Sequence, residues 1–75
     1  MAEVRAEITA NVWKVQVSVG SRVAVGDELA ILESMKMEIP VESPFAGVVA
    51  EVHVAPDDQV REGDLLVVVE PDDEA

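Results

Sequence analysis

The sequence predicts an all-β domain, built as a flattened barrel-sandwich of two four-stranded antiparallel sheets. Three observations support this prediction: apolar residues alternate with polar ones, turn residues recur along the chain, and the sequence contains an internal repeat. The alternation is clear at Val15, Val17 and Val19, which polar residues separate. Such a period of two is typical of strands with one buried face, and no segment has the apolar spacing of a helix.

Turn residues divide the chain into runs of about five to eight residues, which is the length of short strands. Glycine, proline, serine and aspartate mark these turns at 20–21, 26–27, 43–44, 47, 56–58 and 63–64. The runs between them predict about seven or eight strands.

The two halves of the sequence resemble each other at a shift of 37 positions (63 − 26), as when Gly26-Asp27 recurs as Gly63-Asp64. Valine, leucine and glutamate positions match as well: Val12, Val15, Val17, Val23, Leu29 and Glu33 recur as Val49, Val52, Val54, Val60, Leu66 and Glu70. Two copies are too few for a solenoid, so we expect each half to form four strands and to cover the other half's apolar face about a pseudo-two-fold axis. The predicted domain spans residues 1–70, and residues 71–75 are expected to form a short, solvated acidic tail.

The composition limits the classes of function. The chain of 75 residues has 5 basic and 16 acidic residues, a net charge of −11, which disfavours nucleic acids and anionic membranes as partners. The same charge opposes self-association, so we expect a monomer. The start of the chain lacks the pattern of a signal peptide, and no apolar run is long enough to span a membrane. These features and the absence of cysteine predict a cytoplasmic location.

The stretch ESMKMEIPV, residues 33–41, predicts a hairpin with its turn at Met35-Lys36. This register pairs Leu32 with Ile39 on the buried face, as a core requires. A two-residue turn favours Asn-Gly or Asp-Gly because it needs positive φ angles, so Met-Lys is a poor choice for folding.

The same register sets Glu33 opposite Glu38, a like-charge pair that destabilises a hairpin. Most lysines at hairpin tips are simply solvated, and single methionines are more often packing residues than recognition elements. The position of Lys36 at the junction of the two repeats, together with two local rules broken there, favours a functional role.

The stretch VGDELAILESMKMEIPVESPFAGVV, with the second Gly-Asp in EGDLL, resembles the biotinyl/lipoyl attachment family over about Ile8 to Glu70. The resemblance implies a flattened barrel of two four-stranded sheets with Lys36 as the attachment site. It further implies that Met35 and Met37 help a biotin protein ligase recognise the lysine, and that Gly47 helps position the hairpin. We add Glu33 and Glu38 to the predicted recognition residues because of their unfavourable pairing.

A lysine between two methionines resembles the biotin acceptors of this family, because lipoyl acceptors more often contain Asp-Lys-Ala or Asp-Lys-Val. The resemblance therefore implies covalent biotin as the cofactor, and a biotin carboxylase and a carboxyltransferase as further partners. Ser34 stands where many carriers have alanine, and the segment that forms a protruding thumb in some carriers is missing.

No ATP-binding or substrate-binding domain fits in this length, so we expect a carrier without catalytic residues and not an enzyme. Two alternatives remain open. One is a lipoyl carrier of the same fold, and the other is an unmodified adaptor that binds proteins through its acidic surface.

The remaining candidates have simpler interpretations. His53 lies between Val52 and Val54, so the alternation of a strand points it outward, and we expect it on the surface beside Glu51. Trp13 has the parity of Val15 and is expected in the core or at a sheet edge. The acidic cluster of Asp57, Asp58, Glu62 and Asp64 lacks the order of a calcium loop, so we interpret it as turn residues and predict no metal site.

Overall fold

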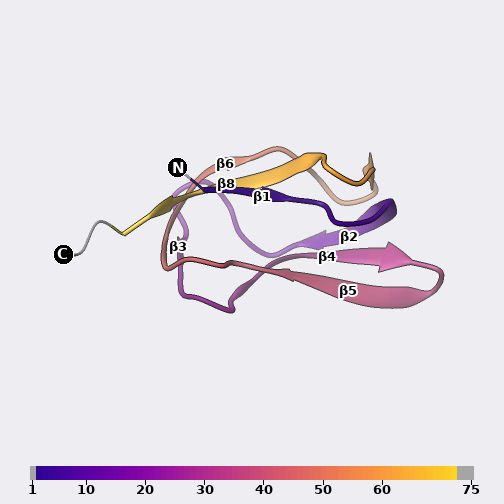
Figure 1. Cartoon of the computed structure of the whole chain (residues 1–75), viewed down its shortest axis with the longest axis horizontal. Helices are drawn as coiled ribbons and strands as arrows, with labels where there is room; N and C mark the ends of the chain where they lie inside the picture. The colour runs from indigo at the N-terminus through magenta and orange to yellow at the C-terminus, as the bar shows by residue number, and fades with distance from the viewer. Residues whose placement is uncertain (1, 73–75) are drawn as a thin grey trace.

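The computed structural model describes residues 2–72, and these form eight strands and no helix (Figure 1). The strands are β1 (Ala2–Arg5), β2 (Ala10–Val15), β3 (Arg22–Val23), β4 (Glu28–Ser34), β5 (Met37–Glu42), β6 (Gly47–Val52), β7 (Gln59–Val60) and β8 (Leu65–Pro71). They make two four-stranded sheets, β1-β8-β6-β3 and β5-β4-β2-β7, in which every pairing is antiparallel. The predicted fold class is confirmed.

The shift of 37 positions exchanges the two sheets. It carries β2 onto β6 (10 + 37 = 47) and β4 onto β8 (28 + 37 = 65), so the ladders β2–β4 and β6–β8 are equivalent. The turns obey the same relation, because Gly26 N donates to Ser43 O at 2.8 Å and Gly63 N donates to Ala6 O at 2.8 Å. The repeat is therefore a pseudo-two-fold arrangement. The β4–β5 hairpin and the carboxyl end of β8 lie at opposite ends of the molecule (Figure 1).

The core lies between the two sheets and is built by the inward residues of both halves. Its residues that are almost fully excluded from solvent are Val12, Leu29, Leu32, Val49, Leu66, Val67 and Val69. Most of them are related by the shift of 37 positions, as Leu29 is to Leu66 and Val12 to Val49. The expectation that each half covers the other is wrong, because strand pairing mixes the halves: β1 and β3 share a sheet with β6 and β8, and β2 and β4 share one with β5 and β7. Removing this apolar surface from water is the main stabilising contribution in a domain without disulfides.

Trp13 is the clearest error of the sequence analysis. It lies in β2, an internal strand, and its side chain is 42% exposed, so it belongs neither to the core nor to a sheet edge. The pairing of β2 with β4 is irregular between Val12 and Lys14, and this bulge turns Trp13 outward. Lys14 Nζ lies 4.5 Å from the centre of the indole ring, which gives the exposed ring a cation partner.

The aspartates of the predicted acidic cluster shape turns. Asp58 Oδ2 accepts a hydrogen bond from Ala55 N at 2.9 Å, and Asp64 Oδ2 accepts one from Arg61 N at 2.9 Å. These are local side-chain contacts of the kind that make aspartate common in turns. Among residues 2–72, no group of three or more histidine or acidic side chains is placed to hold a metal ion. No helix in that range is long and apolar enough to cross a membrane.

The carboxyl end of the described chain is more structured than expected. Strand β8 continues through Pro71, one residue past the predicted boundary at 70. Asp72 N donates to Ala46 O at 2.9 Å, and Arg22 Nη1 lies 3.0 Å from Asp72 Oδ2. These contacts extend the packed structure into the first part of the predicted tail, and residues 73–75 lie outside the described residues.

Candidate functional site

The tip of the β4–β5 hairpin has the predicted register. Backbone pairing places Ser34 opposite Met37 and Leu32 opposite Ile39, which leaves a two-residue turn at Met35-Lys36. Both turn residues have positive φ angles, 54° for Met35 and 66° for Lys36. Two consecutive left-handed residues define a type I′ turn, whose twist matches that of the flanking strands. Both residues of the Met35-Lys36 turn therefore adopt a backbone conformation that is unfavourable for residues with side chains.

The turn residues project into solvent. Met35 is 91% exposed and Met37 is 66% exposed, and Lys36 between them is exposed as well. Within residues 2–72 the Lys36 ammonium forms no ion pair with any carboxylate. Figure 1 shows the hairpin tip as the extreme end of the elongated molecule. An enzyme can therefore reach the Lys36 amine from several directions.

The base of the hairpin is fixed by the core. Leu32 is 1% exposed, and Ile39 and Val41 on the facing strand pack against the core cluster. Because these residues hold both strands of the hairpin, the turn is presented in a defined direction although its side chains are solvated.

Glu33 and Glu38 lie at the neck of the hairpin, directly opposite each other and both exposed. The predicted like-charge pair is therefore present in the structure. It places two exposed carboxylates on the strands that flank the Met35-Lys36 turn.

Gly47 does not lie beside the hairpin. It begins β6 in the other sheet and pairs with Pro71, at the end of the molecule away from the turn (Figure 1). A Cβ atom at this position would lie 2.1 Å from the backbone oxygen of Glu70. Glycine is needed here for close approach of two strands, and no contact of Gly47 supports the expected help in positioning the hairpin.

The hairpin borders a shallow depression of about 300 Å³ that the sequence analysis did not predict. It is lined by Thr9, Ala10, Asn11, Glu33, Ser34, Met35, Lys36 and Gln59. One signal for it was present in the sequence: Asn11 is a poor strand former, and its equivalent in the second repeat is Val48.

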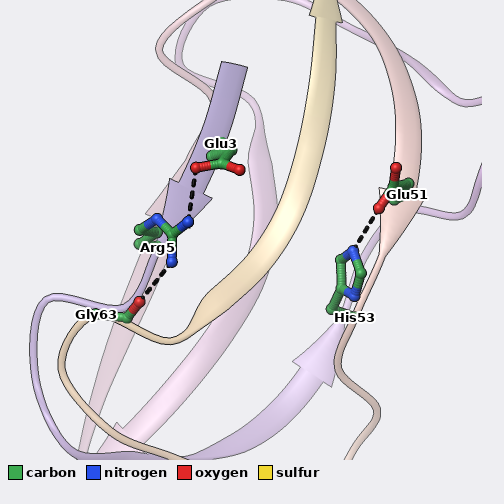
Figure 2. Close-up of polar contacts among 5 residues, drawn as sticks. All are labelled: Glu3, Arg5, Glu51, His53 and Gly63. Atoms are coloured by element: carbon green, nitrogen blue, oxygen red, sulfur yellow. Dashed lines mark hydrogen bonds and ion pairs between the residues drawn. The ribbon is translucent and has the colours of Figure 1, made fainter. Parts of the chain in front are cut away.

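Two further contacts join titratable side chains on the surface. His53 Nε2 lies 2.6 Å from Glu51 Oε1 (Figure 2). Glu51 is in β6, His53 follows the end of that strand, and both are on the surface, as predicted. Arg5 bridges Glu3 Oε1 and the backbone oxygen of Gly63 (Figure 2). Both contacts are between exposed groups.

Comparison with known proteins places this fold and hairpin in a family. A family model described as "Biotin-requiring enzyme", the biotin/lipoyl domain, matches residues 1–69. The chain belongs to the biotin/lipoyl family. A biotinylated protein TB7.3 homolog of Mycobacterium leprae is 53% identical over 70 residues, which cover 92% of this chain and 99% of that protein.

Two further proteins that the chain resembles differ greatly in length. The biotin/lipoyl attachment protein of Bacillus subtilis is 48% identical over 61 residues, which cover 81% of this chain and 84% of that protein. A solved structure of a single-chain, multi-domain long-chain acyl-CoA carboxylase matches with a TM-score of 0.89 and 32% identity, over 96% of this chain but 7% of the carboxylase. The chain is thus similar both to short proteins of about its own length and to a small part of a much larger carboxylase.

Proposed function

We propose that this chain is a biotin-accepting carrier protein in which a biotin protein ligase attaches biotin to Lys36. The observation that carries the proposal is the position of Lys36: exposed, at a two-residue turn anchored on the core, between two exposed methionines. Membership of the biotin/lipoyl family supports it. Met35, Met37, Glu33 and Glu38 would form the surface that the ligase recognises.

The attachment chemistry needs an accessible amine. Lysine amines in water are mostly protonated near neutral pH, so the ligase must remove a proton before Nζ attacks the acyl carbon of an activated biotinyl group. A new amide bond forms, and the activating group leaves with the electron pair of the broken bond. The exposed turn allows the amine to enter a ligase site, and Met35 and Met37 supply polarizable apolar contacts on both sides.

Biotin, once attached, supplies the group that accepts and releases the carboxyl in biotin-dependent carboxylation. The lysine stem and the acyl chain together make an arm of about ten bonds, which reaches on the order of 14 Å. Tethering raises the effective concentration of the carried group to the order of millimolar at sites that the arm can reach. The chain would therefore act as a carrier, not as an enzyme, between a biotin carboxylase and a carboxyltransferase, as a monomer in the cytoplasm.

The match to a domain of an acyl-CoA carboxylase favours a carboxylase assembly as the partner. The alternative of a lipoyl carrier uses the same fold and the same lysine, and is distinguished by which acid the lysine accepts. An unmodified adaptor would leave the lysine free.

The test is the intact mass of the protein, with peptide mapping, after incubation with biotin, ATP and a biotin protein ligase. We expect one biotinyl group on Lys36 and none in the Lys36→Arg variant, because arginine is not a usable nucleophile here. Labelling that persists in this variant would assign the acceptor to Lys14, the other lysine. An unchanged mass in folded protein, with a control carrier labelled, would overturn the proposal and lead to lipoylation as the next test.

A further inference from the structure

The outer face of the β5-β4-β2-β7 sheet has an exposed apolar patch at its centre. Backbone pairing places Pro40 opposite Ile31 and Ile31 opposite Lys14, on β5, β4 and β2. Pro40 is exposed and Ile31 is half-buried. The Trp13 side chain lies at the bulge beside Lys14 and is 42% exposed, although Lys14 Nζ lies 4.5 Å from the centre of its ring. Paired residues project from the same face of a sheet, so Trp13, Ile31 and Pro40 form one surface, here called the Trp13 patch.

The internal repeat shows that the fold does not require the Trp13 patch. The shift of 37 positions relates Trp13, Ile31 and Pro40 to Ala50, Val68 and Glu3 of the other sheet (13 + 37 = 50, 31 + 37 = 68, 40 − 37 = 3). The strand pairing agrees, because Glu3 lies opposite Val68. In the other sheet a methyl group therefore replaces the indole, and a carboxylate replaces the proline. Folding alone does not select the exposed apolar residues of the hairpin's sheet.

The other sheet has polar side chains on both sides of its equivalent apolar residue. Val68 projects from the outer face of β8, and yet it is only 4% exposed. Its two cross-strand neighbours are Glu3 and Glu51. Figure 2 shows the Glu3–Arg5 contact on one side of β8 and the Glu51–His53 contact on the other. These paired side chains flank a buried valine, whereas the equivalent residue of the Trp13 patch stays half-buried.

Two pairs of glutamates bracket the Trp13 patch along the β4–β5 ladder. Glu33 lies opposite Glu38 on the side of the turn, and Glu28 lies opposite Glu42 on the other side. All four are exposed. Like charges directly opposite each other destabilise a ladder, and the other sheet avoids the second repulsion because Arg5 stands at the place of Glu42 (42 − 37 = 5). The hairpin's sheet therefore has an acidic rim that lowers its stability.

An apolar patch with an acidic rim is complementary to a protein surface that has an apolar side chain at its centre and basic residues around it. Tryptophan is enriched among the residues that contribute most to interfaces, and a polar rim typically surrounds such a centre. Arginine binds a carboxylate through two parallel hydrogen bonds. A second copy of this chain is a poor fit, because two chains with a net charge of −11 repel each other. The charge of the rim thus favours a basic protein surface as the occupant.

The Trp13 patch lies on the side of the hairpin and leaves its turn uncovered. Ile31 is four residues from Met35 (35 − 31 = 4), a separation of about 13 Å along the strand. A protein seated on the patch can therefore hold the domain while Lys36 and its arm stay free to move. A carrier that serves two active sites in turn needs such a contact, because a partner that covered the turn would keep the arm in one site.

We propose that the Trp13 patch and its acidic rim form the surface through which a component of a biotin-dependent carboxylase holds this carrier. The component places an apolar side chain against Trp13, and its arginine or lysine side chains meet Glu28 and Glu42. This inference rests on the proposed function, and it leaves the turn, not the patch, to the ligase.

The test is photo-cross-linking in the cells that produce the protein naturally, with p-benzoylphenylalanine in place of Trp13. The full chain is isolated through an affinity tag, and its intact mass confirms both the photoreactive residue and the biotinyl group on Lys36. We expect an adduct that mass spectrometry identifies as a biotin carboxylase or carboxyltransferase component, cross-linked near its arginine or lysine residues. Adding Glu42→Lys to the same chain should lower the adduct yield several-fold, because the rim then repels a basic surface.

The matched control places the photoreactive residue at Glu51, an exposed position of the other sheet, where no adduct with this component is expected. Three results overturn this surface but not the carrier role: a Trp13 adduct only with the ligase or a second copy, no adduct at all, or an equal yield with Glu42→Lys. Absence of the biotinyl group on Lys36 overturns both.

Discussion

Glu33 and Glu38 lie directly opposite each other at the neck of the β4–β5 hairpin, and both are exposed. A like-charged pair in this position destabilises the ladder, whereas an opposite-charge pair contributes about 0.2–1 kcal/mol. Folding does not need this pair, because Leu32 and Ile39 hold the two strands together. A substitution at the pair can therefore test the proposed ligase contact without unfolding the hairpin.

We therefore expect Glu38→Lys to raise the free energy of unfolding by about 0.5 kcal/mol and to slow biotinylation. Urea denaturation measures the first effect, and initial labelling rates measure the second. The matched control is Glu51→Lys, an exposed glutamate of the other sheet, which should leave the labelling rate unchanged. Equal labelling rates in Glu38→Lys and the parent protein would remove this pair from the recognition surface.

Substitutions at the turn residue Lys36 can also distinguish effects on stability from effects on biotin attachment. Lys36 has a φ of 66°, a conformation that costs a residue with a side chain roughly 1–2 kcal/mol and costs glycine little. We expect the free energy of unfolding of Lys36→Gly, measured by urea denaturation, to be about 1 kcal/mol higher than that of Lys36→Arg. Neither variant should accept biotin. A Lys36→Gly protein no more stable than Lys36→Arg would show that the positive φ angle carries no strain here.

The methionines are expected to act on the ligase and not on the fold. Met35 and Met37 are 91% and 66% exposed, so truncation removes little buried surface. We expect Met35→Ala and Met37→Ala to leave stability within about 0.5 kcal/mol of the parent and to lower the labelling rate. Val25→Ala, at another apolar residue with 68% exposure, is the control that should label normally. If both methionine variants are labelled at the parent rate, the ligase does not recognise Met35 or Met37.

Sequence reasoning succeeded where short-range rules decide. The hairpin register follows from the need to bury Leu32 and Ile39, and the exchange of the two sheets follows from the repeat of Gly26-Asp27 at Gly63-Asp64. Alternation also placed His53 beside Glu51 on the surface.

It failed where pairing between distant strands decides. The outward turn of Trp13 depends on a bulge against β4, and the alternation within β2 gives no sign of it. The depression beside the hairpin is lined by both Asn11 and Gln59, and these residues are neighbours only because β2 pairs with β7, a strand of the other repeat. The requirement for Gly47 likewise comes from the approach of the distant residues Glu70 and Pro71, which the family resemblance alone assigned to the hairpin.

The last prediction distinguishes packing from recognition at Gly47. A Cβ atom there would lie 2.1 Å from Glu70 O and 2.9 Å from Pro71 Cα, both backbone atoms that cannot move aside without shifting β8. We expect Gly47→Ala to lower the free energy of unfolding by about 1–3 kcal/mol, because the strands must separate as they do at Ala10. The reverse change at the equivalent position, Ala10→Gly, controls for the general effect of exchanging these two residues. Labelling should be measured at a temperature where Gly47→Ala remains folded by circular dichroism. If glycine serves only to pack β6 against β8, the folded variant labels at the parent rate, whereas slow labelling of fully folded Gly47→Ala would mean that this end of the domain contacts the ligase.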